Sequence, residues 1–279
     1  TKGDLIDYYR AVADWLLPYL EDRPLVLDRY PDGIEGPSFF QKHAPHFTPD
    51  WIRTVTIHSD SGERDIDYFV VESEEALVYM ANSGGIPLHV WSSRVASLDR
   101  PDWTILDLDP KEAPFTSVVE VARGIKELCD QIGLDSFVKT SGKTGLHVLV
   151  PLGRQVSYEH GRMLADLLAL IVARRYPEIA TVNRSLSARG KRVYIDAVQN
   201  GPGRLLVSPL CVRPVPGARV STPLRWREVT AKLDPGRFHI ESVPRRLRSM
   251  KDEPMIAVLD ARPDLLGALE QLAELERRD

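Results

Sequence analysis

Residues 103–110 read W-T-I-L-D-L-D-P and predict a short apolar strand that ends in two acidic side chains. Asp107 and Asp109 stand two residues apart, and because side chains alternate along a strand, both carboxylates leave the same face. Neighbouring anions repel unless a cation lies between them, and carboxylate oxygens are ligands that suit Mg²⁺ or Mn²⁺. A D-x-D pair alone is more often a strand end that faces water, so its interpretation depends on the rest of the chain.

Hydrophobic periodicity on the N-terminal side of this stretch predicts two helices and several strands. A capping box of Thr1 and Asp4 indicates a helix from about Gly3 to Leu20, and Ser73 is expected to cap a second helix. Strands are predicted at 24–30, 51–58, 64–71 and 86–91, with residues 60–62 as the turn of a hairpin.

On the C-terminal side, the same signals predict helices at about 116–131 and 157–176 and strands at 136–140, 146–152 and 192–198. A short strand at 204–207 is expected to pair with a nearby segment. Residues 222–279 are expected to be mostly helical, ending in an amphipathic helix from about Pro263. Mixed helices and strands without an internal repeat predict one α+β domain that can hold two sheets.

The composition is that of an ordinary globular protein. Hydrophobic residues make up 43% of the 279 residues, charged residues 27%, and the net charge of −4 means that phosphate binding would depend on local basic clusters. No apolar run approaches the roughly 20 residues that span a bilayer, and no secretory signal is evident, so the expected compartment is the cytoplasm. Cys129 and Cys211 are expected to be two buried thiols.

Residues 141–148, S-G-K-T-G-L-H-V, have the composition of a phosphate-binding loop. Two glycines allow backbone N–H groups to approach an anion, and Ser141 and Lys143 add a hydroxyl and a cation. The spacing differs from that of a Walker A loop, and a strand follows instead of a helix. The alternative interpretation, a hairpin turn without a ligand, stays open for this segment alone.

A basic cluster precedes the strand that carries Asp196. A single aspartate among apolar strand residues needs a partner, which could be a cation shared with Asp107 and Asp109 or a neighbouring arginine. Near the N-terminus, Phe39 and Phe40 are followed by Lys42, which is the composition of a base-stacking surface, although a buried Phe pair is the more common arrangement. Together, three strand-borne carboxylates, a phosphate loop and basic residues indicate two-metal phosphoryl transfer.

The order of these motifs resembles the archaeo-eukaryotic primase superfamily. D-L-D-P, S-G-K-T-G-L-H-V and V-Y-I-D-A-V-Q-N resemble its motifs I, II and III. R-Y-P-D-G-I-E-G-P-S-F-F-Q-K-H-A-P and I-P-L-H-V-W are similar to the polymerase domain of bacterial ligase D, which acts in non-homologous end joining. The resemblance covers nearly the whole chain. It implies a primase-like core with an RNA-recognition-motif-like sheet and a second β-sheet module, flanked by helices.

The resemblance also implies roles for individual residues. The carboxylates of Asp107, Asp109 and Asp196 would be catalytic and would bind two Mn²⁺ or Mg²⁺ ions. His89 would lie near the incoming sugar, where a hydrogen bond to a 2′-hydroxyl would favour ribonucleotides. The remaining nucleotide contacts would come from Ser141, Gly142, Lys143, His147, Arg189 and Arg213, and the DNA contacts from Lys2, Arg29, Phe39, Phe40 and Lys42.

We therefore expect a single primase-polymerase domain over residues 1–279. Residues 1–102 would form an N-terminal sheet module that contacts the template and the downstream 5′-phosphate, 103–220 a catalytic module, and 221–279 a C-terminal helical segment. The expected function is template-directed filling of short gaps at DNA breaks with NTP or dNTP, in the cytoplasm at the nucleoid and without a membrane partner. A ligase and the end-binding Ku protein are candidate partners, and whether either docks here stays open.

Three other functions are compatible with parts of this pattern. A primase-polymerase of the same superfamily would start chains de novo. A non-catalytic end-binding module would use the Phe pair and the basic residues alone, but it would gain nothing from three carboxylates facing DNA. A metal-dependent phosphohydrolase would be expected to carry further His and Asp ligands.

Overall fold

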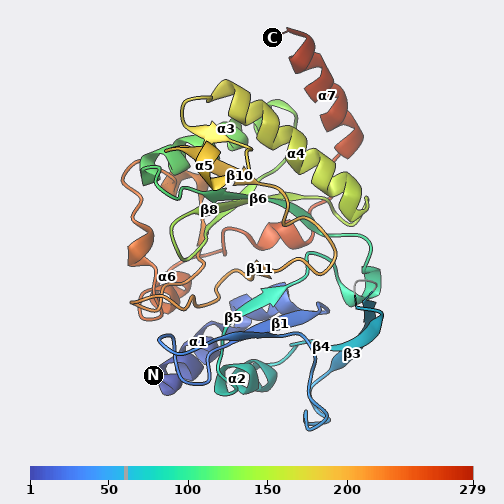
Figure 1. Cartoon of the computed structure of the whole chain (residues 1–279), viewed down its shortest axis with the longest axis vertical. Coiled ribbons are helices and arrows are strands. Elements are labelled where there is room, and N and C mark those ends of the chain that lie inside the picture. The colour runs from blue at the N-terminus through green and yellow to red at the C-terminus, as the bar shows by residue number, and fades with distance from the viewer. Residues whose placement is uncertain (60–61, 279) are drawn as a thin grey trace.

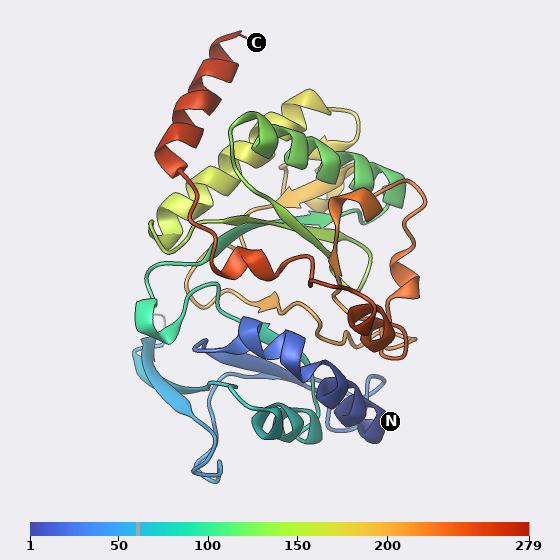
Figure 2. The same ribbon diagram turned by 180° about the vertical axis from the view of Figure 1, so that it is seen from behind.

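Two β-sheets lie one above the other in the computed structural model, which describes residues 1–59 and 62–278 (Figure 1). Helices α3 and α4 cover the outer side of one sheet, while α1 and α2 lie beside the other, as the view from behind also shows (Figure 2). This arrangement confirms the predicted α+β class with two sheets.

The first sheet has the strand order β11-β5-β1-β4-β3, and β2 pairs with β1 outside that path. β3 and β4 form the predicted hairpin, although Asp60 and Ser61 of its turn lie outside the described residues. The strands are β1 (Leu25–Arg29), β2 (Phe39–Gln41), β3 (Thr54–Ser59), β4 (Arg64–Phe69), β5 (Gly85–Val90) and β11 (Leu206–Val207).

Local sequence signals fix where the two helices of this half begin. In α1 (Lys2–Leu20), the Thr1 hydroxyl accepts from the Asp4 backbone N–H and the Asp4 carboxylate reaches back to Thr1, so the predicted capping box is present. α2 (Glu74–Asn82) starts at Ser73, whose side chain accepts from the Ala76 N–H. Both caps satisfy backbone donors that a helix leaves without partners.

The second sheet carries the β-α-β-β-α-β order of an RNA-recognition motif. Its strands run in the order β12-β7-β8-β6-β10-β9, so β6 lies centrally between β8 and β10. The elements are β6 (Trp103–Asp109), α3 (Phe115–Gln131), β7 (Phe137–Thr140), β8 (Leu146–Pro151), α4 (Tyr158–Arg175), β9 (Ala180–Thr181), α5 (Leu186–Arg189), β10 (Val193–Asp196) and β12 (Pro223–Leu224). The implied primase-like sheet is thereby present.

The two faces of β6 have different surroundings. Leu106 and Leu108 pack into the main core with residues of α3 and α4. On the opposite face, Trp103 and Ile105 belong to a second apolar cluster, and Asp107 and Asp109 follow them on that same face. The strand therefore changes from apolar to acidic along one face, and that face is turned away from α3 and α4.

Two short strands join the halves in a way that local patterns do not show. The strand predicted at 204–207 was expected to pair nearby, which was wrong: β11 pairs with β5 of the first sheet, with Val207 opposite His89. β12, which was not predicted, adds to β7 of the second sheet. Two-residue strands have too little pattern of their own to specify a partner, so the tertiary arrangement selects it.

The C-terminal segment is helical only in short pieces before its last helix. It contains 3₁₀ helices η2 (Trp226–Glu228), η3 (Pro235–Arg237) and η4 (Ile256–Leu259), the helix α6 (Val243–Arg248), and α7 (Leu265–Arg278). The C-terminal end of α7 extends beyond the body of the molecule (Figure 1), while Ala268 and Leu272 are buried in the main core and Glu276 pairs with Arg174.

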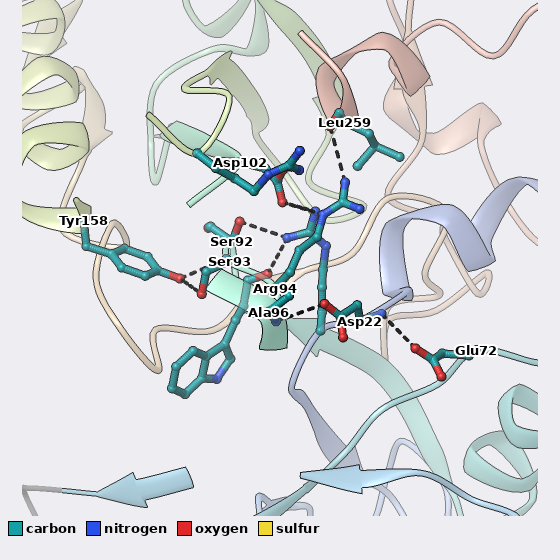
Figure 3. A network of polar contacts seen from close by, with 12 residues as sticks. Asp22, Glu72, Ser92, Ser93, Arg94, Ala96, Asp102, Tyr158 and Leu259 are labelled. Atoms are coloured by element: carbon teal, nitrogen blue, oxygen red, sulfur yellow. Dashed lines mark hydrogen bonds and ion pairs between the residues drawn. The ribbon is translucent and has the colours of Figure 1, made fainter. Parts of the chain in front are cut away.

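A buried ionic network lies where the chain passes from the first sheet to the second. Asp102 is fully buried and accepts from Arg23 at 2.5 Å, Arg154 at 2.5 Å and Arg94 at 3.1 Å. Arg23, also fully buried, donates in addition to the carbonyls of Trp91 and Ser92. Figure 3 shows Asp102 beside Arg94, with Arg94 directed to the carbonyl of Leu259. The network ties the linker between the sheets to both halves of the chain.

Cys129 and Cys211 are both buried and free, as expected, and burial raises their pKa values to about 12 and about 11. Among the helices of the described ranges, none is long and apolar enough to cross a membrane.

Candidate active site

The register of the second sheet gathers the three acidic residues on one face. Asp196 of β10 lies directly opposite Asp107 of β6, and Tyr194 lies opposite Asp109. Cross-strand partners in an antiparallel pair share a face, with Cβ atoms roughly 4.5–5.5 Å apart. All three carboxylates therefore point to the side of the sheet that faces away from α3 and α4.

Each carboxylate already has partners within the chain. The Asp107 Oδ1 lies 3.4 Å from Nε2 of His147, the Asp109 Oδ2 accepts from Arg189 at 3.1 Å, and the Asp196 Oδ1 accepts from the Val198 N–H at 2.7 Å. Tyr194 and Gln199 donate more weakly to Asp196, at 3.4 Å each. An arginine partner for Asp196, the alternative that the sequence left open, is not found among the described residues.

The surroundings of Asp107 favour its ionised form. Desolvation raises the pKa of its carboxyl group, but His147, Lys139 and Arg213 together outweigh that effect and leave the pKa below its usual range. The Asp107 side chain is 31% exposed and that of Asp109 48%. Asp107 is thus anionic, and both side chains are partly accessible to solvent.

The donor set fits divalent ions in its chemistry, because three carboxylates offer hard oxygen ligands on one face. In residues 1–59 and 62–278, however, no three His, Cys, Asp or Glu side chains converge as a ready-made ligand group. Arg189 holds an oxygen of Asp109 that a metal ion would need, and it also stacks on the ring of Tyr194 at 3.8 Å. Among the described residues, the other oxygen of Asp109, Oδ1, accepts only from the Lys111 N–H at 3.2 Å.

A row of polar residues crosses the sheet through Asp107. His147 of β8 is opposite Asp107, and Lys139 of β7 is opposite His147, so the row runs Asp196, Asp107, His147, Lys139. Lys139 is fully buried, and its Nζ lies 2.8 Å from Nδ1 of His147 and 2.7 Å from Oγ of Ser221.

Lys139 was not among the residues selected from the sequence. Its signal was nevertheless present, because a charged side chain in the apolar strand F-V-K-T needs a partner for the same reason as Asp196. Ser221 follows the catalytic module that we predicted and has no motif of its own, so sequence reasoning had no means of finding it.

The predicted phosphate-binding loop lies at the end of β6. A Cβ on Gly145 would stand 2.0 Å from the Leu108 carbonyl oxygen, so only glycine allows the loop to pack against this strand. Gly142 has φ +73°, and a Cβ there would meet the Arg213 side chain at 2.4 Å. The Ser141 hydroxyl accepts from the N–H groups of Lys143 and Gly145 and thus holds the loop in shape.

Positive groups converge beside this loop. Burial first, and then Arg213, Lys139 and Lys143, lower the pKa of His89 to about 3, so this histidine is neutral. Burial and Arg213 also lower the pKa of Lys143, while Asp28 raises it. These mutual effects place the side chains in one electrostatic neighbourhood, which would attract a polyanion.

Three buried polar atoms around this neighbourhood lack a hydrogen-bond partner among the described residues. They are Nδ1 of His89, Nε of Arg213 and Oδ1 of Asp28. Buried polar groups are normally satisfied, and unsatisfied ones are costly, so such a cluster is typical of a site whose ligand supplies the missing partners. Asp28 was not selected from the sequence as a site residue.

The aromatic pair near the N-terminus is exposed on both sides. Phe39 is 48% and Phe40 57% exposed, because β2 pairs only with β1. Together with Lys42 they line a groove of about 510 Å³. Arg29 lies over the Phe39 ring at 5.4 Å, and the Phe40 ring contacts that of His89 at 5.8 Å between centroids. The exposed aromatic surface thus adjoins the predicted nucleotide site.

Lys2 lies apart from the carboxylates, at the start of α1. It lines a separate, mostly apolar cavity of about 360 Å³ together with Tyr30, Ile86 and Arg213. Arg213 therefore connects this cavity to the predicted nucleotide site. The structure brings Asp107, Asp109, Asp196, His147, Arg189 and the loop together and leaves Lys2 at the edge.

Comparison with known proteins relates the whole arrangement to one family. A family model described as the primase-polymerase domain of LigD matches residues 1–254. The chain is 32% identical over 272 residues to the bifunctional non-homologous end joining protein LigD of Bacillus subtilis, covering 93% of this chain and 43% of that protein. It is also 32% identical to the multifunctional LigD of Pseudomonas aeruginosa, covering 96% of this chain and 32% of that protein.

A solved structure shows the same fold. The polymerase domain of Mycobacterium tuberculosis ligase D, in complex with DNA, superposes with a TM-score of 0.86 at 28% identity. The match covers 94% of this chain and 93% of that domain. The chain thus spans less than half of the length of the two curated relatives but nearly all of the solved domain.

Proposed function

Because this chain belongs to the family of LigD primase-polymerase domains, which are nucleotidyltransferases, we propose that it fills short gaps at broken DNA ends by template-directed synthesis during non-homologous end joining. The proposal includes a preference for ribonucleotides and the use of two divalent ions. The observation that carries it is the register of β6 and β10, which sets three carboxylates on one face beside a glycine loop and a group of cations.

Asp107, Asp109 and Asp196 would hold the two ions, which are Mn²⁺ or Mg²⁺. Divalent ions held by these residues would supply Lewis-acid chemistry for phosphoryl transfer, lowering the pKa of a primer 3′-hydroxyl and neutralising phosphate charge. Arg189, which now donates to Oδ2 of Asp109, would lie beside the bound ions and could turn from Asp109 to the nucleotide. Freed from Asp109, its guanidinium would be available to the triphosphate.

The residues around the loop would bind and orient the nucleotide. The Gly142 backbone N–H would donate to the triphosphate, and the side chains of Lys143 and Arg213 would balance its charge. Ser141 would keep the loop in position. Nδ1 of His89 has no hydrogen-bond partner in the described ranges and could bond to a ribose 2′-hydroxyl. Because the ring is neutral, it adds no positive charge next to Arg213, Lys139 and Lys143.

DNA would lie across the exposed face of the first sheet. Phe39 and Phe40 would stack on template bases, with Arg29 and Lys42 at the backbone, and stacking of this kind contributes about 1–3 kcal/mol per base. Lys2 would contact a downstream 5′-phosphate. A ligase and Ku would act with this domain in the complete repair reaction; the names of the relatives support only the link to non-homologous end joining.

The experiment is primer extension on a gapped duplex with and without a 5′-phosphate on the downstream strand, in Mn²⁺ and in Mg²⁺. We expect the wild-type chain to add nucleotides opposite the gap and to prefer the phosphorylated substrate. Asp107→Asn, which keeps the shape of the side chain, should lower the rate by more than about 10²-fold because a metal ligand and its charge are lost.

The matched control is Asp99→Asn, which makes the same chemical change at a side chain that is 82% exposed and remote from the three carboxylates. This variant should extend like the wild-type chain. Extension by Asp107→Asn at the wild-type rate would disprove the metal-binding role, and dinucleotide synthesis without a primer would instead indicate a priming enzyme.

A further inference from the structure

Lys139 occupies a position that the proposed reaction does not by itself require. It is fully buried in β7, and the sheet places it opposite His147, two strands away from Asp107. Its Nζ contacts Nδ1 of His147 at 2.8 Å and Oγ of Ser221 at 2.7 Å. A lysine that is removed from water in this way normally has a specific task or is replaced by an apolar residue.

The direction of the hydrogen bonds can be assigned from one fixed end. The Thr140 carbonyl can only accept, so the Ser221 hydroxyl, which lies 2.9 Å from it, donates its proton there. Ser221 must then accept from Lys139. Below its pKa of about 7, Lys139 is an ammonium group with three donors and no acceptor, so in this form Nδ1 of His147 must accept as well.

The other end of the chain of contacts is consistent with this assignment. If Nδ1 of His147 accepts, the ring proton of the neutral histidine is on Nε2. That atom faces Oδ1 of Asp107 at 3.4 Å, and a carboxylate can only accept. A ring that accepts from Lys139 at Nδ1 holds only one proton, so this contact by itself requires the neutral form of His147.

We propose that Lys139 is a positioning residue that fixes His147 in the tautomer with its proton on Nε2, directed at Asp107 and at the incoming triphosphate. The catalytic consequence rests on the proposed function, whereas the assignment of the tautomer does not. Without Lys139, Nδ1 would face a buried space with no donor, and the ring would be free to exchange tautomers or to turn away from Asp107.

A purely structural lysine would have different consequences. In that case Lys139 would only join β7 to Ser221, and its removal would change stability but not the protonation of His147. The two possibilities are separated by the nitrogen spectrum of His147, recorded on ¹⁵N-histidine-labelled protein from about pH 6 to 7 without nucleic acid or metal. Protonated and unprotonated ring nitrogens differ strongly in their ¹⁵N shifts, so the tautomer is read directly.

In the wild-type chain, we expect Nε2 protonated and Nδ1 unprotonated. Lys139→Met removes the donor and should shift the ¹⁵N signals of both His147 ring nitrogens toward the average of the two tautomers. Lys139→Gln keeps an N–H donor and should restore part of the wild-type pattern. Lys126→Met makes the same substitution on α3, where the side chain pairs with Asp130, and should leave His147 unchanged.

Gap-filling rates give the second measurement. Loss of a group that orients a ligand-binding histidine lowers activity by about 10- to 100-fold, so Lys139→Met should lower kcat in that range, with Lys139→Gln in between. KM for the gapped duplex should change little, because Lys139 does not face the DNA surface.

Several results would overturn the proposal. One is a wild-type spectrum with the proton on Nδ1, which needs no variant at all. Another is Lys139→Met with an unchanged His147 spectrum. If Lys139→Met does not fold, Ser221→Ala takes its place, since loss of this acceptor should loosen Lys139 and shift the same two signals; unchanged signals there also refute the proposal. Absence of extension by the wild-type chain would refute the proposed function and leave the tautomer assignment intact.

Discussion

The two ends of β6 carry aspartates in opposite situations. Asp102, just before the strand, is fully buried and has three arginines around it. Asp107 and Asp109, at its far end, are partly exposed and have a neutral histidine and one arginine as partners. We call the buried group around Asp102 the closed network and the partly exposed group around Asp107 and Asp109 the open network.

The cations at the two ends differ in the same way. Burial lowers the pKa of Arg23 to about 10, and Asp102 opposes that decrease, so the guanidinium stays charged. Burial and Arg213 lower the pKa of Lys139 to about 7, although Asp107 raises it. The closed network joins the sheets. In the open network, Lys139 has no carboxylate from the described part of the chain in direct contact to balance its charge, and perturbed groups of this kind are common at functional sites.

The largest expected effect is the loss of the closed network. Asp102→Ala would leave Arg23, Arg94 and Arg154 without their shared carboxylate, and removal of one partner from a buried ion pair costs about 3–5 kcal/mol. Urea unfolding of the purified variant measures this loss.

Asp107→Ala is the matched comparison at the other end of the strand. It removes a carboxylate that is 31% exposed, so water screens its contact with His147, and we expect a loss of at most about 1 kcal/mol. A larger loss for Asp107→Ala than for Asp102→Ala would contradict the distinction between the two ends.

A second prediction concerns pH. Between about pH 7 and 10, the unfolded chain keeps a proton on Lys139 that the folded protein has released, so the free energy of unfolding of the wild-type chain rises with pH through this group, by at most about 1.4 kcal/mol per unit. Lys139→Met lacks this dependence, so its stability relative to wild type should fall by about 2 kcal/mol from pH 7 to pH 9.

Lys126→Met serves as the control for this measurement. Its free energy of unfolding relative to wild type should stay constant from pH 7 to pH 9. If the free energy of unfolding of Lys139→Met relative to wild type also stays constant, Lys139 does not titrate in this pH range.

The smallest expected effect concerns His89. One hydrogen bond contributes about 0.5–1.5 kcal/mol, so His89→Ala should reduce the preference for NTP over dNTP by about 3- to 10-fold in the extension assay. His58→Ala, at an exposed histidine on β3, is the control. An unchanged ratio in His89→Ala would remove this residue from sugar recognition.

Sequence reasoning succeeded where the signal was local. Thr1, Ser73 and Ser157 are the N-cap residues of three helices that were predicted to start at or next to them. An N-cap bonds a backbone N–H only three positions away, so its signal is local. It failed for β11, whose partner β5 lies more than a hundred residues earlier. It also missed Lys139, although the rule applied to Asp196 would have found it.

The amino-acid pattern alone specified the strands that carry Asp107, Asp109 and Asp196, the glycine loop, and the aromatic pair, since alternation and turn composition are properties of neighbouring residues. Only the tertiary structure set Asp196 opposite Asp107, bound Arg189 to Asp109, and left Phe39 and Phe40 both exposed. Register and burial depend on which distant segments pack together, and no short stretch of sequence contains that information.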